Sequence, residues 1–216
     1  MAEILIDGKP FYYKRLEEDL GVLNKENAKE FLSLIKREFE KSNILFFLNF
    51  GTLLGAYRDH DFISNDVDMD LGIFEKDMDS FYRLIPKLDQ LGVKLCRAWG
   101  GVFFSFLYKG VVCDFNVYYK AKFPYHYFFW GVSEGRYTPK KLLSDFKPYD
   151  FMGEQYMIPV KVEDYLNLAY GKDWRIPQNR PGQSMPDWMF LTRYYIRIKR
   201  KIRFLKCKYI THTPFE

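Results

Sequence analysis

Cysteine is scarce in this chain of 216 residues, and its three copies stand far apart, at Cys96, Cys113 and Cys207. Their spacing fits neither a zinc site nor a disulfide framework, and a few scattered thiols are typical of a reducing cytosol. Long apolar runs are also missing, since the densest one, residues 44–48, is far too short to cross a bilayer. The first twenty residues carry charges throughout and lack the apolar stretch of a signal peptide. We therefore expect a soluble, cytoplasmic protein.

An excess of one charge is confined to the end of the chain. The formal net charge is +5, and residues 193–208 hold eight basic side chains and no acidic one. The remainder is close to neutral, so the total predicts no nucleic-acid partner. As a helix, the tail would be basic and amphipathic. It would then either rest on anionic lipid at the inner face of the cell membrane or pack its apolar side on the domain.

Aromatic residues are abundant: 21 Phe, 17 Tyr and 4 Trp make up 19% of the chain. We expect most of these rings to fill a single large core. The sequence contains no internal repeat, no low-complexity tract and no clear linker. It therefore predicts a single domain, large enough for an enzyme, over residues 1–190 and a basic helical tail over residues 191–216.

Hydrophobic periodicity predicts a mixture of helices and strands. Asn24 and Asp77 are suited to cap two of the helices, and Gly92 and Gly171 to end two of them. Turn residues between the strands at 93–119 predict antiparallel neighbours. The predicted helices are 25–42, a turn at 53–57, 78–91 and 162–170, and the predicted strands are 44–48, 67–74, 93–98, 102–108, 111–119 and a hairpin with its turn at 152–154.

In the segment 66–74, the apolar residues Val67, Met69, Leu71 and Ile73 alternate with Asp66, Asp68, Asp70 and Gly72. On a strand, Asp68 and Asp70 project from one face, with Asp66 one step behind, while Met69 and Leu71 project from the other. A charged edge strand is the plain alternative. Carboxylates this close repel each other unless one is protonated or a cation lies between them. Because all the ligands are oxygen atoms, the pattern predicts Mg²⁺ or Mn²⁺.

Two further segments point to the same chemistry. Asp114 interrupts an apolar strand and faces away from its core residues, so it can act as a third metal ligand or take a proton from an attacking hydroxyl. A simple structural pairing with an arginine is the alternative. Gly51 and Thr52 follow a buried strand and offer backbone N–H groups and a hydroxyl to a phosphate.

Taken together, these segments resemble the polymerase-β-like nucleotidyltransferase fold and, within it, the LicD family with its fukutin-type members. The resemblance rests on two separated regions that together span about residues 44–177. The matching segments are GTLLGAYR at 51–58, Phe62-Ile63, Asp66-x-Asp68-x-Asp70, Gly153-Glu154, Ile158-Pro159, Tyr165-Leu166 and YGKDW at 170–174.

This resemblance implies an α+β fold with a mixed or antiparallel sheet flanked by helices. It also implies a metal-dependent phosphotransferase that moves phosphocholine or a phospho-alditol from CDP-choline, CDP-ribitol or CDP-glycerol to a glycan hydroxyl and releases CMP. Asp68 and Asp70 would hold the metal, with Asp114 as ligand or base. Gly51, Thr52, Arg58 and Asp66 would lie at the donor. Nucleotidyl transfer with release of pyrophosphate is the alternative.

The chain departs from the family in one motif. The family usually reads Pro-Trp-Asp-Asp-Asp-x-Asp, whereas residues 64–70 here read SNDVDMD. The alternate aspartates are retained, but Pro, Trp and the middle Asp are lost. The metal pair is therefore expected as in the family, and the departure bears on which group is transferred.

Overall fold

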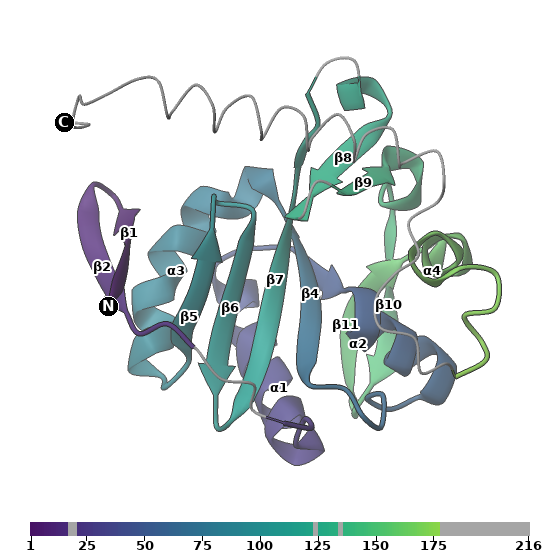
Figure 1. The fold of residues 1–216 in the computed structure, drawn as a ribbon, viewed down its shortest axis with the longest axis horizontal. Helices are drawn as coiled ribbons and strands as arrows, with labels where there is room; N and C mark the ends of the chain where they lie inside the picture. Colours follow the sequence, from purple (N-terminus) through teal and green to yellow (C-terminus); the bar gives the residue numbers. More distant parts are fainter. Residues whose placement is uncertain (17–20, 123–124, 134–135, 178–216) are drawn as a thin grey trace, which may run out of the picture.

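A computed structural model describes residues 1–16, 21–122, 125–133 and 136–177 of the chain. It is an α+β structure with one central mixed sheet (Figure 1). The strands are β1 Ala2–Ile6, β2 Lys9–Tyr13, β3 Phe46–Leu48, β4 Asp68–Phe74, β5 Lys94–Trp99, β6 Phe103–Tyr108, β7 Val111–Lys120, β8 Phe129–Val132, β9 Arg136–Pro139, β10 Phe146–Phe151 and β11 Glu154–Pro159. The helices are α1 Lys25–Lys41, α2 Phe50–Leu54, η1 Gly55–Asp59, η2 Glu75–Asp77, α3 Met78–Gln90, η3 Tyr125–Tyr127, η5 Lys140–Leu142 and α4 Val162–Tyr170.

The central sheet has the strand order β3-β4-β7-β6-β5, and β8 and β9 extend it from β7. Strands β4 and β7 are parallel, whereas β3–β4, β6–β7 and β5–β6 are antiparallel. The turn pairs at Gly100-Gly101 and Lys109-Gly110 connect β5, β6 and β7 with positive φ angles. The antiparallel neighbours expected from those turns are therefore confirmed.

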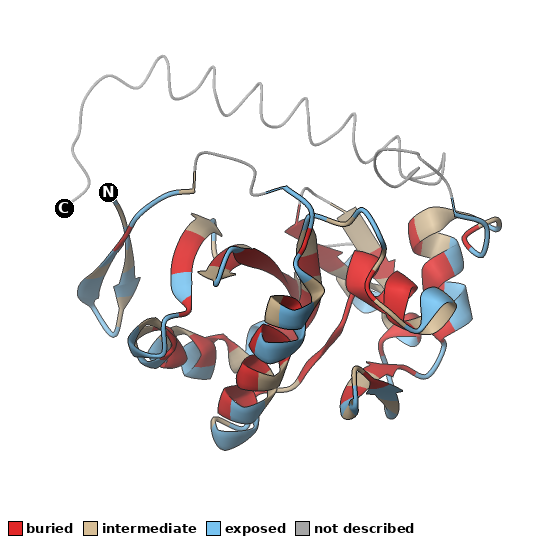
Figure 2. Cartoon of the chain, turned by 90° about the horizontal axis from the view of Figure 1, so that it is seen from below, coloured by how far each residue is buried: buried red, intermediate tan, exposed pale blue. Residues whose placement is uncertain are grey.

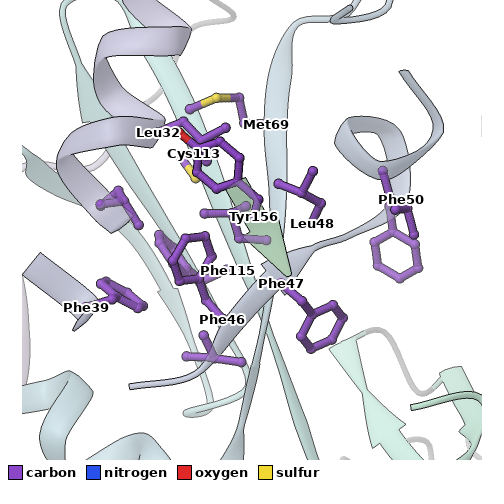
Figure 3. Close-up of a cluster of buried hydrophobic side chains, with 14 of the residues drawn as sticks. Leu32, Phe39, Phe46, Phe47, Leu48, Phe50, Met69, Cys113, Phe115 and Tyr156 are labelled. Atoms are coloured by element: carbon purple, nitrogen blue, oxygen red, sulfur yellow. The ribbon is translucent and has the colours of Figure 1, made fainter. Parts of the chain in front are cut away.

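One face of this sheet packs on α1 and α3 and forms the main core. Phe115 of β7 stacks on Phe39 of α1 with ring centroids 5.3 Å apart, and Phe81 of α3 contacts Phe104 and Phe106 of β6. Figure 3 shows Phe39, Phe46 and Phe115 gathered beside α1. Buried residues follow one side of each helix in Figure 2 because their apolar positions recur with the helical period.

The opposite face of the sheet, which we call the site face, is divided into a polar half and an apolar half. Alternation along the strands places Asp68, Asp70, Asp114 and Asn116 on it. Beyond them the face becomes aromatic: the Phe47 ring lies over Gly72, where an added Cβ would come within 2.2 Å of the ring. Phe47 contacts Phe74, Tyr118 and Phe146 in this second aromatic cluster. Because Gly72 has no side chain, the Phe47 ring of β3 can lie across β4.

Most of the predicted elements are confirmed, with local corrections. Asn24 caps α1 as expected, since its side chain accepts a hydrogen bond from Asn27 N at 3.0 Å. Asp77 precedes α3 but its side chain makes no capping bond, so that part of the prediction is wrong. The acidic strand begins at Asp68, and Val67 is 51% exposed instead of buried with Met69. The strand expected over 44–48 covers only Phe46–Leu48.

No helix in the described ranges is long and apolar enough to cross a membrane. The predicted basic tail, residues 191–216, lies outside the described residues, and so do both interpretations of it. The N-terminal hairpin β1–β2 is held to α3 by an ion pair between Arg83 and Asp7. Helix α4 lies against α2 and β11, and β11 lies beside β3 (Figure 1).

Candidate active site

The aspartates predicted from the sequence are brought together where β4 and β7 run side by side (Figure 1). Asp70 is the register partner of Asp114, and Asp68 lies one pair earlier on the same face. Neighbouring strands are about 5 Å apart, so the carboxylates of Asp70 and Asp114 share one small region. Parallel pairing in this register, which no local pattern encodes, creates the acidic cluster.

The turn after β3 holds Asp70 in a fixed position. Gly51 N donates to Asp70 Oδ2 at 3.1 Å, and Asp70 N donates to Thr52 Oγ1 at 2.8 Å. Asn116 Nδ2 donates to Asp70 Oδ1 at 3.3 Å. The Gly51 N–H is thus engaged by Asp70, and the Thr52 hydroxyl accepts from Asp70 N while its own O–H can still donate. Contacts of Gly51 and Thr52 with a donor phosphate remain a prediction.

A side chain at position 51 would displace the carboxylates around it. A Cβ at Gly51 would lie 2.9 Å from Asp66 Oδ2 and 3.3 Å from Asp70 Oδ2. The carboxylates of Asp66 and Asp70 therefore both reach the backbone of this turn. The preceding residue, Phe50, has a φ of 34°, a strained value for a residue with a side chain. Such strain is typical of backbone held in place by its surroundings at a functional site.

A buried hydrogen-bond network around Asn49 holds the same turn in place. The Tyr118 hydroxyl donates to Asn49 Oδ1 at 3.0 Å, and the Tyr165 hydroxyl donates to the same oxygen. Asn49 N in turn donates to the carbonyl oxygen of Asp70 at 3.1 Å. All three side chains are almost fully buried. The network joins β3, β7 and α4 to the acidic strand and fixes the start of α2.

The electrostatics of the cluster are unfavourable without a counter-charge. Burial is the main cause of raised pKa values, to about 6 for Asp66 and about 7 for Asp114. The pKa of Asp68 is also raised by burial, and that of Asp70 is raised well above its usual value by burial and by the charges of Asp68 and Asp114. A site that holds carboxylates in this state favours either protons or a cation.

The residues fit a divalent cation by the chemistry of their ligands. Asp114 is buried, and its Oδ1 has no hydrogen-bond partner within the described residues. No group of three or more His, Cys, Asp and Glu side chains in the described ranges is set as a ready metal site. Mg²⁺, however, commonly takes only one or two carboxylates and completes its coordination with water and substrate phosphates. Asp68, Asp70 and Asp114 are the side chains that could hold it.

Arg58, expected at the donor, is engaged elsewhere. Its guanidinium donates to both carboxylate oxygens of Asp59, at 2.8 and 2.7 Å, and to the Trp174 carbonyl at 3.3 Å. It thereby ties η1 to the segment after α4. The nearby Asp61 forms an ion pair with Lys25 and not with Arg58. Any contact of Arg58 with a donor phosphate remains a prediction.

Two cations near the aspartates are absent from the sequence-based prediction. The charge of Arg97 on β5 lowers the pKa values of Asp68 and Asp114, against the effect of burial. Arg136 of β9 lies over the Phe50 ring at 4.8 Å. Burial, followed by the charges of Asp70 and Asp66, raises the pKa of Tyr170 well above its usual value, and the charge of Arg136 opposes this shift. Neither arginine stands in a recognisable motif. Asn116 could have been found, because it follows Asp114 by two residues on the same face.

Two of the solved structures that resemble this chain do so weakly. The solution structure of antibiotic-resistance factor ANT(2'')-Ia has a TM-score of 0.48 and 13% identity, covering 73% of this chain and 78% of that chain. A crystal structure of ANT(2")-Ia in complex with adenylyl-2"-tobramycin has a TM-score of 0.45 and 13% identity, covering 71% and 81%. These weak similarities add nothing to the assignment of the site.

Sequence relatives are more informative. Human ribitol-5-phosphate transferase FKTN is 27% identical over 184 residues, which are 79% of this chain and 38% of FKTN. The mouse protein of the same name is 28% identical over 166 residues, or 71% of this chain and 34% of that protein. An uncharacterised protein of Rickettsia typhi is 26% identical over 175 residues, 77% of this chain and 48% of that protein. The chain thus spans well under two thirds of the length of these relatives.

The family description "LicD/FKTN/FKRP, nucleotidyltransferase domain" matches residues 43–161, from the end of α1 to the end of β11. That stretch is more than half of the chain, and it contains the turn at Gly51, the acidic strand β4 and Asp114 of β7. The chain therefore belongs to the LicD/FKTN/FKRP family and carries its nucleotidyltransferase domain.

Proposed function

We propose that this chain is a metal-dependent phosphotransferase that uses a CDP-linked donor and a glycan acceptor. It would move phosphocholine, ribitol phosphate or glycerol phosphate to a glycan hydroxyl and release CMP. Family membership and the similarity to FKTN support a transferase of this general class. The observation that carries the proposal is the buried pair of Asp70 and Asp114, whose pKa values are raised and which shares one face of the sheet with Asp68.

The proposed reaction is an in-line displacement at one phosphorus atom. The oxygen of an acceptor hydroxyl forms a bond to the phosphorus that carries the alditol or choline. The bond from that phosphorus to the bridging oxygen of the diphosphate breaks, and CMP leaves with the bonding electrons. The hydroxyl proton passes to the carboxylate of Asp114, which lies beside Asp70 and would act as the general base.

The residues around the aspartates would divide the remaining tasks. A divalent cation held by Asp68 and Asp70 would neutralise the donor's diphosphate charge when bound. The hydrogen bonds from Gly51 and Asn116 hold the Asp70 carboxylate in one orientation, which limits its reorganisation on binding. Arg136, beside Phe50, would attract the same phosphates.

The test is product identification with the whole chain. We expect Mg²⁺-dependent release of CMP from at least one of CDP-ribitol, CDP-glycerol and CDP-choline, with an added glycan hydroxyl or water as the acceptor of the phosphoryl group, measured by chromatography. A thermal-shift titration with CDP and Mg²⁺ should raise the melting temperature by mass action. Release of pyrophosphate from CTP, without CMP from any CDP-linked donor, would instead support nucleotidyl transfer and overturn the proposal.

A further inference from the structure

A pair of aromatic rings lies on the site face and takes no part in the core. Trp99 at the end of β5 is 60% exposed, and the ring of Phe103 at the start of β6 lies 5.4 Å from it at an interplanar angle of 33°. Large exposed rings occur singly on many surfaces. Two adjoining rings beside a polar site form instead an apolar platform of the kind that binds ligands.

A β-bulge directs these side chains toward the aspartates. The register of β5 and β6 shifts between Leu95 and Arg97, so Cys96 is the extra residue. After the shift, Arg97 is opposite Ser105 and Trp99 is opposite Phe103. Without the bulge, regular pairing would put Cys96 opposite Ser105 and Arg97 opposite Phe104, on the face of the main core. Bulges that redirect side chains are common next to active sites.

The register continues across the sheet to the acidic pair. Ser105 is opposite Asp114, which in turn is opposite Asp70, so Arg97 lies in the same row. Phe103 is opposite Asn116, so the rings lie in the next row. The turn after Trp99 is closed by a hydrogen bond from Val102 N to the Trp99 carbonyl at 3.0 Å, with positive φ at Gly100 and Gly101. The platform is therefore part of a tight hairpin.

The position of the platform identifies which substrate it would meet. Gly51 and Thr52 lie on the β3 side of Asp70, whereas Trp99 and Phe103 lie beyond Asp114 on the β5 side. In-line displacement requires the attacking and leaving oxygens on opposite sides of the phosphorus. If the donor's diphosphate lies at the Gly51 side, the acceptor must approach from the side of Asp114.

We propose that Trp99 and Phe103, together with Arg97, form a subsite for a pyranose ring of the glycan acceptor. The C–H face of a pyranose is electropositive and complements the negative face of an aromatic ring. The Arg97 guanidinium is the nearest charged donor in the row and would bind a ring hydroxyl. This inference rests on the proposed function, because it assigns the acceptor side of the same reaction.

The experiment separates the two substrates by using two probes on the full chain. The first probe is CDP with Mg²⁺, followed by calorimetry. The second is a set of methyl pyranosides and β-linked disaccharides of glucose, galactose and N-acetylglucosamine, followed by saturation-transfer NMR in the presence of CDP and Mg²⁺. The variants are Trp99→Ala and a matched control, Tyr12→Ala, which removes a ring that is 59% exposed on the N-terminal hairpin.

We expect at least one pyranoside to bind the wild-type chain and the Tyr12→Ala control, and to bind Trp99→Ala at least tenfold more weakly. The affinity for CDP should stay within twofold in all three proteins. Equal pyranoside binding by Trp99→Ala, or binding of none by the wild type, would overturn the inference. A tenfold loss of CDP affinity in Trp99→Ala would also overturn it, by assigning the rings to the donor's base.

Failure of the proposed function has a different signature. If the wild-type chain binds no CDP with Mg²⁺, the donor assignment fails whatever the pyranosides do. If CDP binds normally but no pyranoside depends on Trp99, only the acceptor subsite is refuted.

Discussion

The two faces of the central sheet are built from the same strands but are stabilised in opposite ways. On the helix side, Phe115 packs against Phe39 and Phe81 and gains stability from burial. On the site face, the adjacent Asp114 is also buried, yet its burial raises the pKa of its carboxyl group to about 7. Apolar burial on the helix side thus offsets the unfavourable burial of carboxylates on the site face, which is arranged to bind a positive charge.

Removing one carboxylate from the site face tests this contrast most strongly. We expect Asp70→Asn to lower turnover about 10³-fold or more, because it removes a charge from the place where the phosphate is bound. The fold should be retained, since Asn keeps the shape of the side chain. The measurements are CMP release and melting temperature, with Asp79→Asn on the exposed side of α3 as the matched control. Near-normal turnover in Asp70→Asn would refute the site.

Neighbouring residues of β7 should respond in opposite directions. Phe115→Ala should reduce the free energy of unfolding by about 3–5 kcal/mol, because it opens a cavity among rings. Asp114→Asn should leave the metal-free protein equally stable or more stable, because it removes a buried charge. Urea denaturation at pH 7.5 with a chelator compares the two. A larger loss from Asp114→Asn than from Phe115→Ala would contradict the assignment of the two faces.

The pH dependence of stability should carry the signature of the site face. The pKa values of Asp66 and Asp114 are raised in the folded state, to about 6 and about 7, so the folded protein binds more protons than the unfolded chain. The free energy of unfolding without metal should therefore fall as the pH rises from about 4 to about 7.

Denaturation with a chelator at pH 5 and pH 7.5 checks this effect, with Asp114→Asn as the variant that should show a smaller fall. Saturating Mg²⁺ should stabilise the protein more at pH 7.5 than at pH 5, because the ionised carboxylates bind it. A fall of equal size in wild type and Asp114→Asn would show that other groups cause it.

Substitution of Glu38 on α1 should have the smallest effect on the free energy of unfolding. Its pH dependence should be opposite to that of Asp66 and Asp114. Its buried carboxylate forms ion pairs with Lys87 at 2.6 Å, Lys41 at 2.9 Å and Arg37 at 3.1 Å. Hydrogen bonds from Lys87 and then Lys41 are the main causes of a pKa lowered to about 2. Glu38→Gln should cost about 1–2 kcal/mol at pH 7, since three half-exposed cations lose their partner.

Because the folded-state pKa is lowered, the contribution of Glu38 is present above about pH 4.5 and is lost as the pH falls toward 2. Urea denaturation of both proteins at pH 7 and near pH 2.5 should therefore show a difference that narrows in acid. A difference that is independent of pH would mean that the carboxylate acts through packing alone.

Several parts of the fold could be predicted because their signals are local. Alternation along residues 68–74 placed Asp68 and Asp70 on one face of the sheet. The same argument placed Asp114 and Phe115 on different faces. Asn24, Gly92 and Gly171 marked helix ends correctly, because capping depends on a few neighbouring atoms. Asp77 failed as a cap, since its side chain makes no bond to the helix that follows.

Other features arise from contacts between distant segments and left no local signal. The extra residue at Cys96 reverses the faces of Arg97 and Trp99, which simple alternation would have misplaced. The Gly51 N–H and the Thr52 hydroxyl bind Asp70 across 19 and 18 residues, so their availability could not be read from the motif. Arg136 reaches Phe50 only because β9 pairs with β8 beside β7.

The sequence by itself determined the chemistry available to this protein: aspartates at alternate positions, a glycine in the turn before them, and strands with one apolar face. These follow from backbone periodicity, which acts over a few residues. Only the tertiary structure decided that β4 and β7 are parallel and in register, so that Asp70 meets Asp114. Register between distant strands is set by how the whole core packs, and the charge repulsion of the site exists only after that packing has formed.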